Sequence, residues 1–274
     1  MTRARVARGV SRVLGALALA YVGLCVAARL GYKKLLYPAP VRPVPAALEH
    51  DFRTLEVPGD GAEVLALERT ARPGRPTLVM FHGNGEVVDD LVPLGEALTS
   101  EGLGFVAMEY RGYGRRSSLA PSEAGITSDA IALVRTLAAR NVSPIVLVGY
   151  SLGSAVAAEV AYRGLGARLV LVSPFTSMTA MGERLAPILP VGLLMEERFD
   201  TLSKAPHISL KTLVIHGTND ELVPFAMGER VASALPAARL VPVRGGTHTS
   251  VLSGLDEAAN RTVLETITRF AEAP

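Results

Sequence analysis

The chain has 274 residues, enough for one large domain, since cores generally divide beyond ~250 residues. Apolar residues make up 49% and charged residues 20%, so the chain can bury a sizeable core and does not have the composition of a disordered protein. Residues 1–40 carry seven Arg or Lys and no acid, which leaves 21 of the 28 basic residues and all 26 acidic residues in the rest. This mildly acidic remainder argues against a nucleic-acid-binding protein, because such proteins present a basic face.

The first predicted element is an apolar helix between two basic flanks. Its uncharged part runs from Val13 to Ala28, and as a helix it reaches ~24 Å, a little short of a ~30 Å hydrocarbon core. Snorkelling of Arg29 extends the usable span to Tyr32. The basic residues of the flanks are Arg3, Arg5, Arg8 and Arg12 before the run, and Arg29, Lys33 and Lys34 after it. We therefore expect residues 1–34 to be a retained membrane anchor.

A cleaved signal peptide and a peripheral or buried helix are the alternatives. Ala18-Leu19-Ala20 has the small-x-small form of a cleavage site, but the apolar run continues past it. More basic residues precede the run than follow it, which predicts a cytoplasmic N-terminus and an extracytoplasmic domain, or a secreted domain if the segment is cleaved. The only cysteine, Cys25, lies in this segment, so no intrachain disulfide can form. Residues 35–50 contain prolines at short intervals, at Pro38, Pro40, Pro43 and Pro45, which predicts an extended connector.

Residues 51–274 have the pattern of an α/β domain. An antiparallel hairpin of edge strands is expected first, at Phe52–Val57 and Glu63–Arg69. Six apolar runs then predict buried strands at Leu78–Phe81, Phe105–Met108, Ile145–Val148, Leu169–Val172, Thr212–Ile215 and Arg239–Val243. Helical patterns separate them at Val88–Ser100, Ser122–Arg140, Leu152–Arg163, Ala226–Leu235 and Glu257–Ala271, with Ser122 as an N-cap. Strands that alternate with helices predict a mostly parallel, twisted sheet flanked by helices.

One connection is much longer than the others. After Ser173-Pro174 the chain takes nearly forty residues to reach the strand at Thr212. Its apolar residues are interrupted by Pro187, Pro190 and Gly192, so we expect short helices. Residues of about 175–210 are therefore predicted to form a small helical lid.

The pentapeptide Gly149-Tyr150-Ser151-Leu152-Gly153 lies between a predicted strand and a predicted helix. A strand, a sharp turn and a helix are the context of a nucleophile elbow, in which the serine Oγ is exposed above the sheet. Glycine is expected at positions 149 and 153, because only a small residue fits where the strand and the helix pass close together. A buried serine in a tight turn is the alternative, but the context favours Ser151 as a nucleophile.

A serine hydroxyl needs a base and the base needs an orienting carboxylate. The histidines are His50, His82, His207, His216 and His248. Only His248 lies in a loop after the last predicted strand, from which it can reach the serine. Asp220 follows the strand that ends at His216 and is the candidate for the orienting carboxylate, with Glu221 as the alternative. The chain order Ser151, Asp220, His248 is the one that accompanies a nucleophile elbow of this kind. His82 and His216 are expected to have structural roles.

The negative charge that develops on a carbonyl oxygen during acyl transfer needs preorganised N–H donors. The residue after the nucleophile supplies one, which is the backbone N–H of Leu152. The second is expected from the loop His82-Gly83-Asn84-Gly85, and Asn84 is favoured over Gly85. No cofactor or metal is expected, since no segment resembles a nucleotide-binding loop, a metal cluster or a haem motif.

With these residues in place, the chain resembles the small, often membrane-anchored α/β-hydrolase-domain proteins related to the yeast bud-emergence suppressor group. The matching motifs from about Leu35 to the C-terminus are Phe81–Gly85, Tyr110–Gly114, the Ser151 elbow, His216–Pro224 and Gly245–His248. The resemblance implies Ser151, Asp220 and His248 as a catalytic triad, and Asn84 with Leu152 as oxyanion donors. The family includes thioesterases and lipid hydrolases that act at membranes, and Tyr110–Gly114 has no catalytic role in it.

Three positions in two motifs depart from the family pattern. Gly85-Glu86 stands where Ala-Gly is frequent, and Ser154 stands where Gly is frequent. Glu86 places a carboxylate near the oxyanion loop, but it leaves the Asn84 N–H in place, so we expect an active protein.

The expected activity is hydrolysis of a carboxylic ester or thioester with an apolar, lipid-like acyl group through an acyl-serine intermediate. A peptidase or amidase with the same triad, and a hydrolase-fold binding protein without activity, are the alternatives. Dehalogenase and epoxide hydrolase chemistry is disfavoured, because it needs Asp in place of Ser151.

Overall fold

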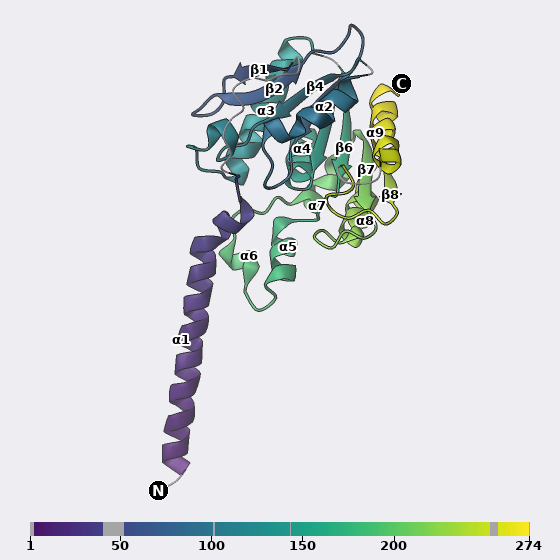
Figure 1. Ribbon diagram of the computed structural model, residues 1–274. Helices are drawn as coiled ribbons and strands as arrows, with labels where there is room; N and C mark the ends of the chain where they lie inside the picture. The colour runs from purple at the N-terminus through teal and green to yellow at the C-terminus, as the bar shows by residue number, and fades with distance from the viewer. Residues whose placement is uncertain (1–2, 41–51, 101, 143, 253–256, 274) are drawn as a thin grey trace.

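The computed structural model describes residues 3–40, 52–100, 102–142, 144–252 and 257–273. His50 and residues 41–50 of the expected connector lie outside the described residues. A long N-terminal helix, α1 (Arg3–Leu36), projects from a layered α/β domain (Figure 1).

An eight-stranded sheet forms the centre of the domain, in the order β1-β2-β4-β3-β5-β6-β7-β8. Its strands are β1 (Arg53–Val57), β2 (Val64–Arg69), β3 (Thr77–Phe81), β4 (Gly104–Met108), β5 (Ile145–Tyr150), β6 (Arg168–Val172), β7 (Lys211–Gly217) and β8 (Ala238–Val243). The β1/β2 and β2/β4 pairs are antiparallel and the other five pairs are parallel. The prediction of a mostly parallel sheet is confirmed. The expectation that both hairpin strands lie at an edge is wrong for β2, because β2 also pairs with β4.

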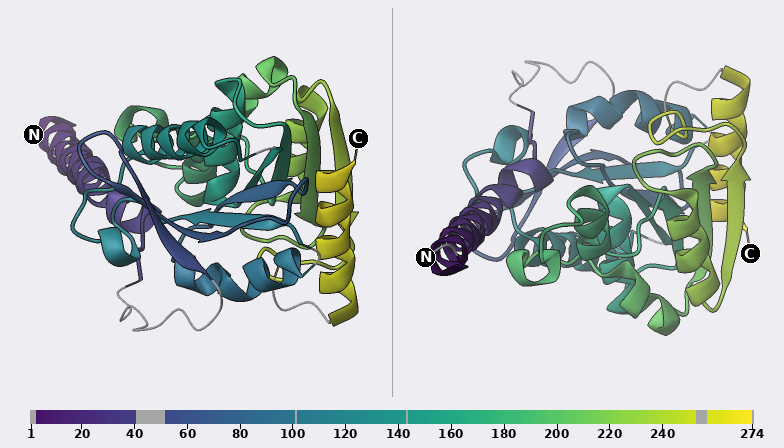
Figure 2. Two further views of the ribbon diagram at one scale, coloured as in Figure 1. Left: turned by 90° about the horizontal axis from the view of Figure 1, so that it is seen from above. Right: turned by 90° about the horizontal axis from the view of Figure 1, so that it is seen from below.

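Helices cover both faces of this sheet (Figure 2). One face carries α2 (Val92–Thr99) and α9 (Glu257–Glu272), and the other carries α3 (Glu123–Ala139), α4 (Leu152–Tyr162) and α8 (Phe225–Ala234). The central strands β3, β4 and β5 are buried along their whole length. Their sequences are therefore continuous apolar runs and do not alternate between apolar and polar residues.

Local sequence explains where these helices begin. Ser122 caps α3, since its side chain accepts a hydrogen bond of 3.1 Å from the Gly125 N–H. The predicted helix at Val88–Ser100 is divided into a 3-10 turn, η1 (Val88–Leu91), and α2. Pro93 lies in the first turn of α2, where its missing N–H costs no helical hydrogen bond, so the α-helix starts there and not at Val88.

The segment between β6 and β7 folds into short helices. We call residues 175–210 the lid segment; it contains α5 (Met178–Leu185), α6 (Val191–Leu194), α7 (Thr201–Lys204) and a 3-10 turn, η3 (Ala205–His207). Another 3-10 turn, η2 (Gly114–Arg116), follows β4. Pro187 and Pro190 separate α5 from α6, as expected from the missing proline N–H. Several apolar side chains of the lid segment are exposed: Leu185 by 73%, Ile188 by 69% and Leu193 by 85%.

The helix α1 contains a stretch, Gly9–Leu36, that is long and apolar enough to cross a membrane, by a test that a signal sequence also passes. It continues two residues beyond the expected end of the anchor, to Leu36, and stops just before Pro38, which disfavours helical backbone at Tyr37. The extended connector at residues 35–50 stays a prediction. At the end of α1, Tyr32, Leu36 and Tyr37 are buried in the main core cluster, and α1 lies beside α6.

Candidate active site

Ser151 lies at the turn between β5 and α4, and its backbone is strained. Its φ of 50° and ψ of −116° are values that residues with a side chain rarely adopt. A Cβ atom at Gly149 would collide with the Gly153 carbonyl, and one at Gly153 would collide with the Phe81 carbonyl. Both glycines are therefore required for the strand and helix to pass this closely, as the sequence predicted.

The structure brings Ser151, His248 and Asp220 into hydrogen-bonding contact. The distance from His248 Nε2 to Ser151 Oγ is 2.9 Å, and the distance from His248 Nδ1 to Asp220 Oδ2 is 2.8 Å. A carboxylate only accepts hydrogen bonds, so Nδ1 carries the imidazole proton and Nε2 is left to accept from the serine hydroxyl. This tautomer is the one that a general base for Ser151 needs.

The Asp220 carboxylate is fully buried and held in an ionised form. Burial alone raises the pKa of Asp220, but the His216 Nε2, 3.4 Å from Oδ2, and hydrogen bonds from His248 and the Val223 N–H outweigh it and hold the pKa well below its usual range. The N–H groups of Leu222 and Val223 donate to Oδ1 at 3.1 and 2.7 Å, which leaves Oδ2 for His248. The competing acid, Glu221, is exposed.

Backbone contacts between two loops fix the distance from Asp220 to His248. A Cβ atom at Gly217, at the end of β7, would collide with the Gly246 carbonyl, and the Asn219 N–H donates to that carbonyl at 2.9 Å. The Tyr150 hydroxyl donates to the His248 carbonyl at 3.0 Å. Tyr150 therefore links the elbow to the histidine loop, a role that the sequence analysis did not assign.

The expected oxyanion donors, Asn84 and Leu152, line one cavity together with Ser151. Asn84 is exposed on the loop after β3, and its side-chain oxygen accepts a hydrogen bond of 2.8 Å from the Tyr113 hydroxyl. The Tyr110 hydroxyl donates to the His82 carbonyl in the same loop, at 2.9 Å. The segment Tyr110–Gly114, predicted to be a structural loop, thus supports the loop that carries Asn84.

Glu86 folds back onto this loop. Its Oε2 accepts from the Gly83 N–H at 2.6 Å and leaves the Asn84 N–H untouched. Burial raises the pKa of Glu86, and the nearby His82 and the Gly83 hydrogen bond oppose that rise. The side chain therefore tightens the turn at the cost of holding a partly buried carboxyl.

The structure also describes His82, His207 and His216, and none of them is hydrogen-bonded to Ser151 or His248. His82 and His216 are fully buried: His82 stacks on Tyr110 with ring centroids 3.8 Å apart, and the His216 Nε2 donates to the Val223 carbonyl at 2.9 Å. His207 is exposed on the lid segment. Among the residues that the structure describes, no three or more His, Cys, Asp or Glu side chains are grouped so that they could hold a metal ion.

The cavity at Ser151 has a volume of about 660 Å³, within the range of small-molecule sites. Its walls are mainly apolar and come from the lid segment, the loop after β7 and the last turns of α1, together with Asn84, Ser151 and Leu152. The lid contributes Phe175, Met178, Met181, Gly182, Leu185, Ala186, Leu189, Val191, Leu194 and Met195. An extended apolar space therefore leads away from the serine.

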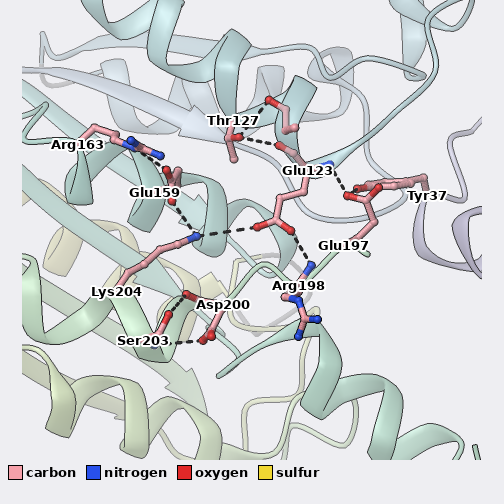
Figure 3. A network of polar contacts seen from close by, with 11 residues as sticks. Tyr37, Glu123, Thr127, Glu159, Arg163, Glu197, Arg198, Asp200, Ser203 and Lys204 are labelled. Carbon is pink, nitrogen blue, oxygen red and sulfur yellow. Dashed lines mark hydrogen bonds and ion pairs between the residues drawn. The ribbon is translucent and has the colours of Figure 1, made fainter. Parts of the chain in front are cut away.

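A chain of polar contacts joins α1, the lid segment, α3 and α4. Glu197, nearly buried, forms an ion pair with Lys33 at 2.7 Å and accepts from the Glu123 N–H at 2.5 Å. Figure 3 shows its continuation, in which Lys204 lies between Glu123 and Glu159, 3.9 and 2.8 Å from their carboxylates. The sequence contained a signal for this contact, two adjacent acids, Glu196 and Glu197, directly after the apolar run of residues 191–195. Lys33, however, was interpreted only as a membrane flank.

Two family models match consecutive parts of the chain: one described as serine aminopeptidase, S33, at residues 72–199, and one described as TAP-like protein at residues 196–269. An uncharacterised protein of Mycobacterium tuberculosis is 35% identical over 201 residues, which cover 71% of this chain and 69% of that protein. A protein of Danio rerio named lysophosphatidylserine lipase ABHD12 is 31% identical over 185 residues. The chain belongs to the α/β-hydrolase-domain proteins of the ABHD12 group. The match to the Danio rerio protein covers 60% of this chain and about half, 48%, of that protein.

Solved structures agree with this α/β-hydrolase assignment. An esterase of Pyrococcus furiosus has a TM-score of 0.65 at 20% identity, and the match covers 85% of this chain and 96% of that one. A soluble variant of monoglyceride lipase from Saccharomyces cerevisiae has a TM-score of 0.62 at 15% identity, with 84% and 98% covered. The predicted α/β-hydrolase fold is confirmed, and the family is one of hydrolases with lipase and esterase relatives.

Proposed function

We propose that this α/β-hydrolase cleaves carboxylic esters or thioesters with an apolar acyl group, through an acyl-Ser151 intermediate. The observation that carries the proposal is the hydrogen-bonded series from Ser151 through His248 to the ionised Asp220, at one end of an apolar cavity. The lipase and esterase names of its relatives support the same class of substrate.

In the first half of the reaction, Ser151 Oγ attacks the carbonyl carbon while His248 Nε2 takes the hydroxyl proton. The carbonyl oxygen becomes negatively charged and is stabilised by the N–H groups of Leu152 and Asn84. The bond to the leaving oxygen or sulfur then breaks, and His248 returns the proton to that atom. The product is an alcohol or a thiol, and the acyl group remains on Ser151.

In the second half, a water molecule attacks the acyl carbon while His248 removes its proton. The bond to Ser151 Oγ breaks, the proton passes to that oxygen, and the carboxylic acid leaves. Asp220 stays ionised throughout and stabilises the imidazolium form of His248 in each half.

A serine-reactive fluorophosphonate probe tests the nucleophile directly. We expect the full-length protein to be labelled and Ser151→Ala to be unlabelled. Ser233→Ala is the control, because Ser233 lies exposed on α8 with a hydrogen bond only to its own helix. Equal labelling of Ser151→Ala and the wild type would refute the assignment.

An amidase or aminopeptidase is the second candidate, favoured by the description of the family model at residues 72–199. An aminopeptidase needs an acid to bind the free amino group of its substrate, whereas none of the described residues that line the cavity is Asp or Glu. The lining therefore favours acyl esters. Comparing acyl esters with aminoacyl amides of equal size separates the two activities.

We further propose that α1 remains attached as a single-pass membrane anchor, with the N-terminus in the cytoplasm and the catalytic domain outside it. The span Gly9–Leu36 and the excess of basic residues before its apolar core support this arrangement. Secretion after cleavage near Ala20 is the alternative, and mass measurement of the mature chain distinguishes the two.

A further inference from the structure

The last turns of α1 form part of the cavity that contains Ser151. Seven of the residues that line this cavity belong to α1: Ala27, Ala28, Gly31, Tyr32, Lys34, Leu35 and Leu36. A helix that served only as a tether would not need to contact the space next to the nucleophile. The same helix is the segment that is apolar and long enough to cross a membrane.

Polar contacts hold α1 against the lid segment along about four turns. The Tyr21 hydroxyl donates to the Ile188 carbonyl at 2.8 Å, and Arg29 forms an ion pair with Glu196. Further along the helix, Lys33 pairs with the nearly buried Glu197. These contacts come from residues on one side of α1, so the helix has a defined rotation and presents the same side chains to the cavity.

The contact at Tyr21 also sets how deep the lid tip would lie in a membrane; we call the turn between α5 and α6, which contains Ile188, the lid tip. Tyr21 lies eight residues before Arg29, which places it ~12 Å along the helix from the basic flank and near the middle of the apolar run. Its partner Ile188 must therefore lie at hydrocarbon depth when α1 spans a membrane. The exposed side chains of Leu185, Ile188 and Leu193 agree with that position, because apolar groups are favoured in hydrocarbon over water.

We infer that α1 is one wall of the acyl-binding site, and that a membrane-resident ester enters this site sideways from the bilayer, with its acyl chain between α1 and the lid segment. The inference rests on the proposed ester hydrolysis at Ser151. The acyl chain thus passes from lipid to an apolar cavity without crossing water, and Lys34 at the cavity lies beside the polar end of the substrate.

Gly31 is the residue of α1 that best tests this wall. It lines the cavity, and a Cβ atom added there would meet nothing within 4 Å, so a larger side chain would enter the open space. Glycine inside a helix is unfavourable relative to leucine, so Gly31→Leu is not expected to weaken the helix itself.

The first experiment compares Gly31→Leu with Gly23→Leu in the full-length protein, reconstituted in phosphatidylcholine vesicles. Gly23 is the matched control, because it lies on the same helix, also has open space around its Cβ position, and does not line the cavity. The substrates are p-nitrophenyl palmitate and p-nitrophenyl butyrate. For Gly31→Leu we expect kcat/KM to fall about tenfold or more for palmitate, as when two or more methylene groups lose their binding site, and to change little for butyrate.

For Gly23→Leu we expect both values to be unchanged. An unchanged palmitate-to-butyrate ratio in Gly31→Leu would overturn the role of α1 in the site. Failure of the proposed function is a separate result: the wild type would then hydrolyse neither ester in a way that depends on Ser151.

The second experiment tests the depth of the lid tip. The chain contains no tryptophan, so Ile188→Trp introduces a single fluorophore at the tip, and Tyr162→Trp places one on the exposed end of α4 as a control. We expect lipids brominated on their acyl chains to quench the fluorescence of Ile188→Trp and not that of Tyr162→Trp. Quenching of Ile188→Trp by aqueous acrylamide alone would overturn entry from the bilayer.

Discussion

At the scale of single residues, the site depends on side chains that are held in costly states. Ser151 has a strained backbone, Asp220 is a fully buried charge, and Glu86 is a carboxyl whose pKa is raised by burial. Asp220 is stabilised by His248, which is distant in sequence, and Glu86 by the nearby Gly83 N–H. Changing one of these residues should therefore affect chemistry or stability in a direction that the contacts specify.

Asp220→Asn should lower kcat by ~10³- to 10⁴-fold, because an amide no longer enforces the His248 tautomer or stabilises its cation. Glu221→Gln is the matched control, since Glu221 is the adjacent acid and is exposed, and it should leave kcat within about twofold. Steady-state kinetics on a short acyl ester measures both. A larger loss in Glu221→Gln than in Asp220→Asn would show that the acid is misassigned.

Glu86→Gln should stabilise the protein increasingly as pH rises from about 4.3, the ordinary value for a glutamate. The pKa of Glu86 is raised in the folded state, so between the unfolded and folded values the native protein binds more protons and its free energy of unfolding falls as pH rises. Glutamine does not ionise and avoids this loss, while its carbonyl still accepts from the Gly83 N–H.

Denaturant unfolding of both proteins at pH 4 and pH 7.5 measures this difference. If the difference in free energy of unfolding between Glu86→Gln and the wild type were smaller at pH 7.5 than at pH 4, the prediction would be contradicted. The activity of the wild type tests the related expectation about the oxyanion loop: an inert wild type that Glu86→Ala made active would show that the carboxylate blocks catalysis.

At the scale of elements, α1, the lid segment, α3 and α4 are connected by charged side chains. Glu197 contacts α1 through Lys33 and α3 through the Glu123 N–H, and Lys204 continues the connection to Glu159 at the end of α4 (Figure 3). Burial raises the pKa of Glu159, but hydrogen bonds from Lys204 and Arg163 outweigh it, so the carboxyl stays ionised. The helix α4 begins immediately after Ser151, so these contacts connect α1 to the helix that follows the elbow.

Glu197→Ala should lower the free energy of unfolding by ~1–3 kcal/mol, because it leaves the Glu123 N–H and Lys33 without their buried acceptor. Glu196→Ala is the control: its side chain is 64% exposed and pairs with Arg29 at the surface, where such pairs contribute ~0–1 kcal/mol. Denaturant unfolding in detergent micelles measures both. Equal effects of the two substitutions would mean that Glu197 does not fasten α1 to the domain.

At the scale of the whole molecule, the two ends of α1 lie in different surroundings. Residues 9–20 of α1 are exposed, and its last turns pack on the lid segment and line the cavity at Ser151. The lid helices α5 and α6 lie beside α1 (Figure 1), and Lys34 of its basic flank lines the cavity at Ser151. Because α1 is proposed as a membrane anchor, its orientation would decide on which side of the membrane the proposed hydrolysis takes place.

Protease treatment of intact cells should digest the catalytic domain and spare an N-terminal epitope tag, because the greater number of basic residues precedes the apolar run and keeps the N-terminus in the cytoplasm. Immunoblotting for tags at the two ends measures this. Treatment of permeabilised cells is the control that the folded domain can be cut. A domain protected in intact cells and digested after permeabilisation would reverse the proposed topology.

The features that the sequence predicted are those with a local physical cause. Alternation of apolar runs with helical patterns specifies a parallel sheet, and proline limits helices locally: Pro93 lies in the first turn of α2, and Pro187 follows the end of α5. The glycines at Gly149 and Gly153 predicted a close crossing of strand and helix, and the structure shows it. The roles of Ser151, Asp220 and His248 stay predictions, now with a geometry that supports them.

The serine elbow and the layered sheet, then, were determined by the sequence alone, because periodicity and turn chemistry act over a few residues. Only the tertiary structure decided that Tyr113 supports Asn84, that Glu197 binds Lys33, and that Gly31 faces the cavity. These contacts join residues far apart in the chain, such as Lys33 and Glu197, and no period or spacing encodes them. The helix that the sequence identified as an anchor becomes part of the site because packing, and not pattern, determines which of its faces meets the lid.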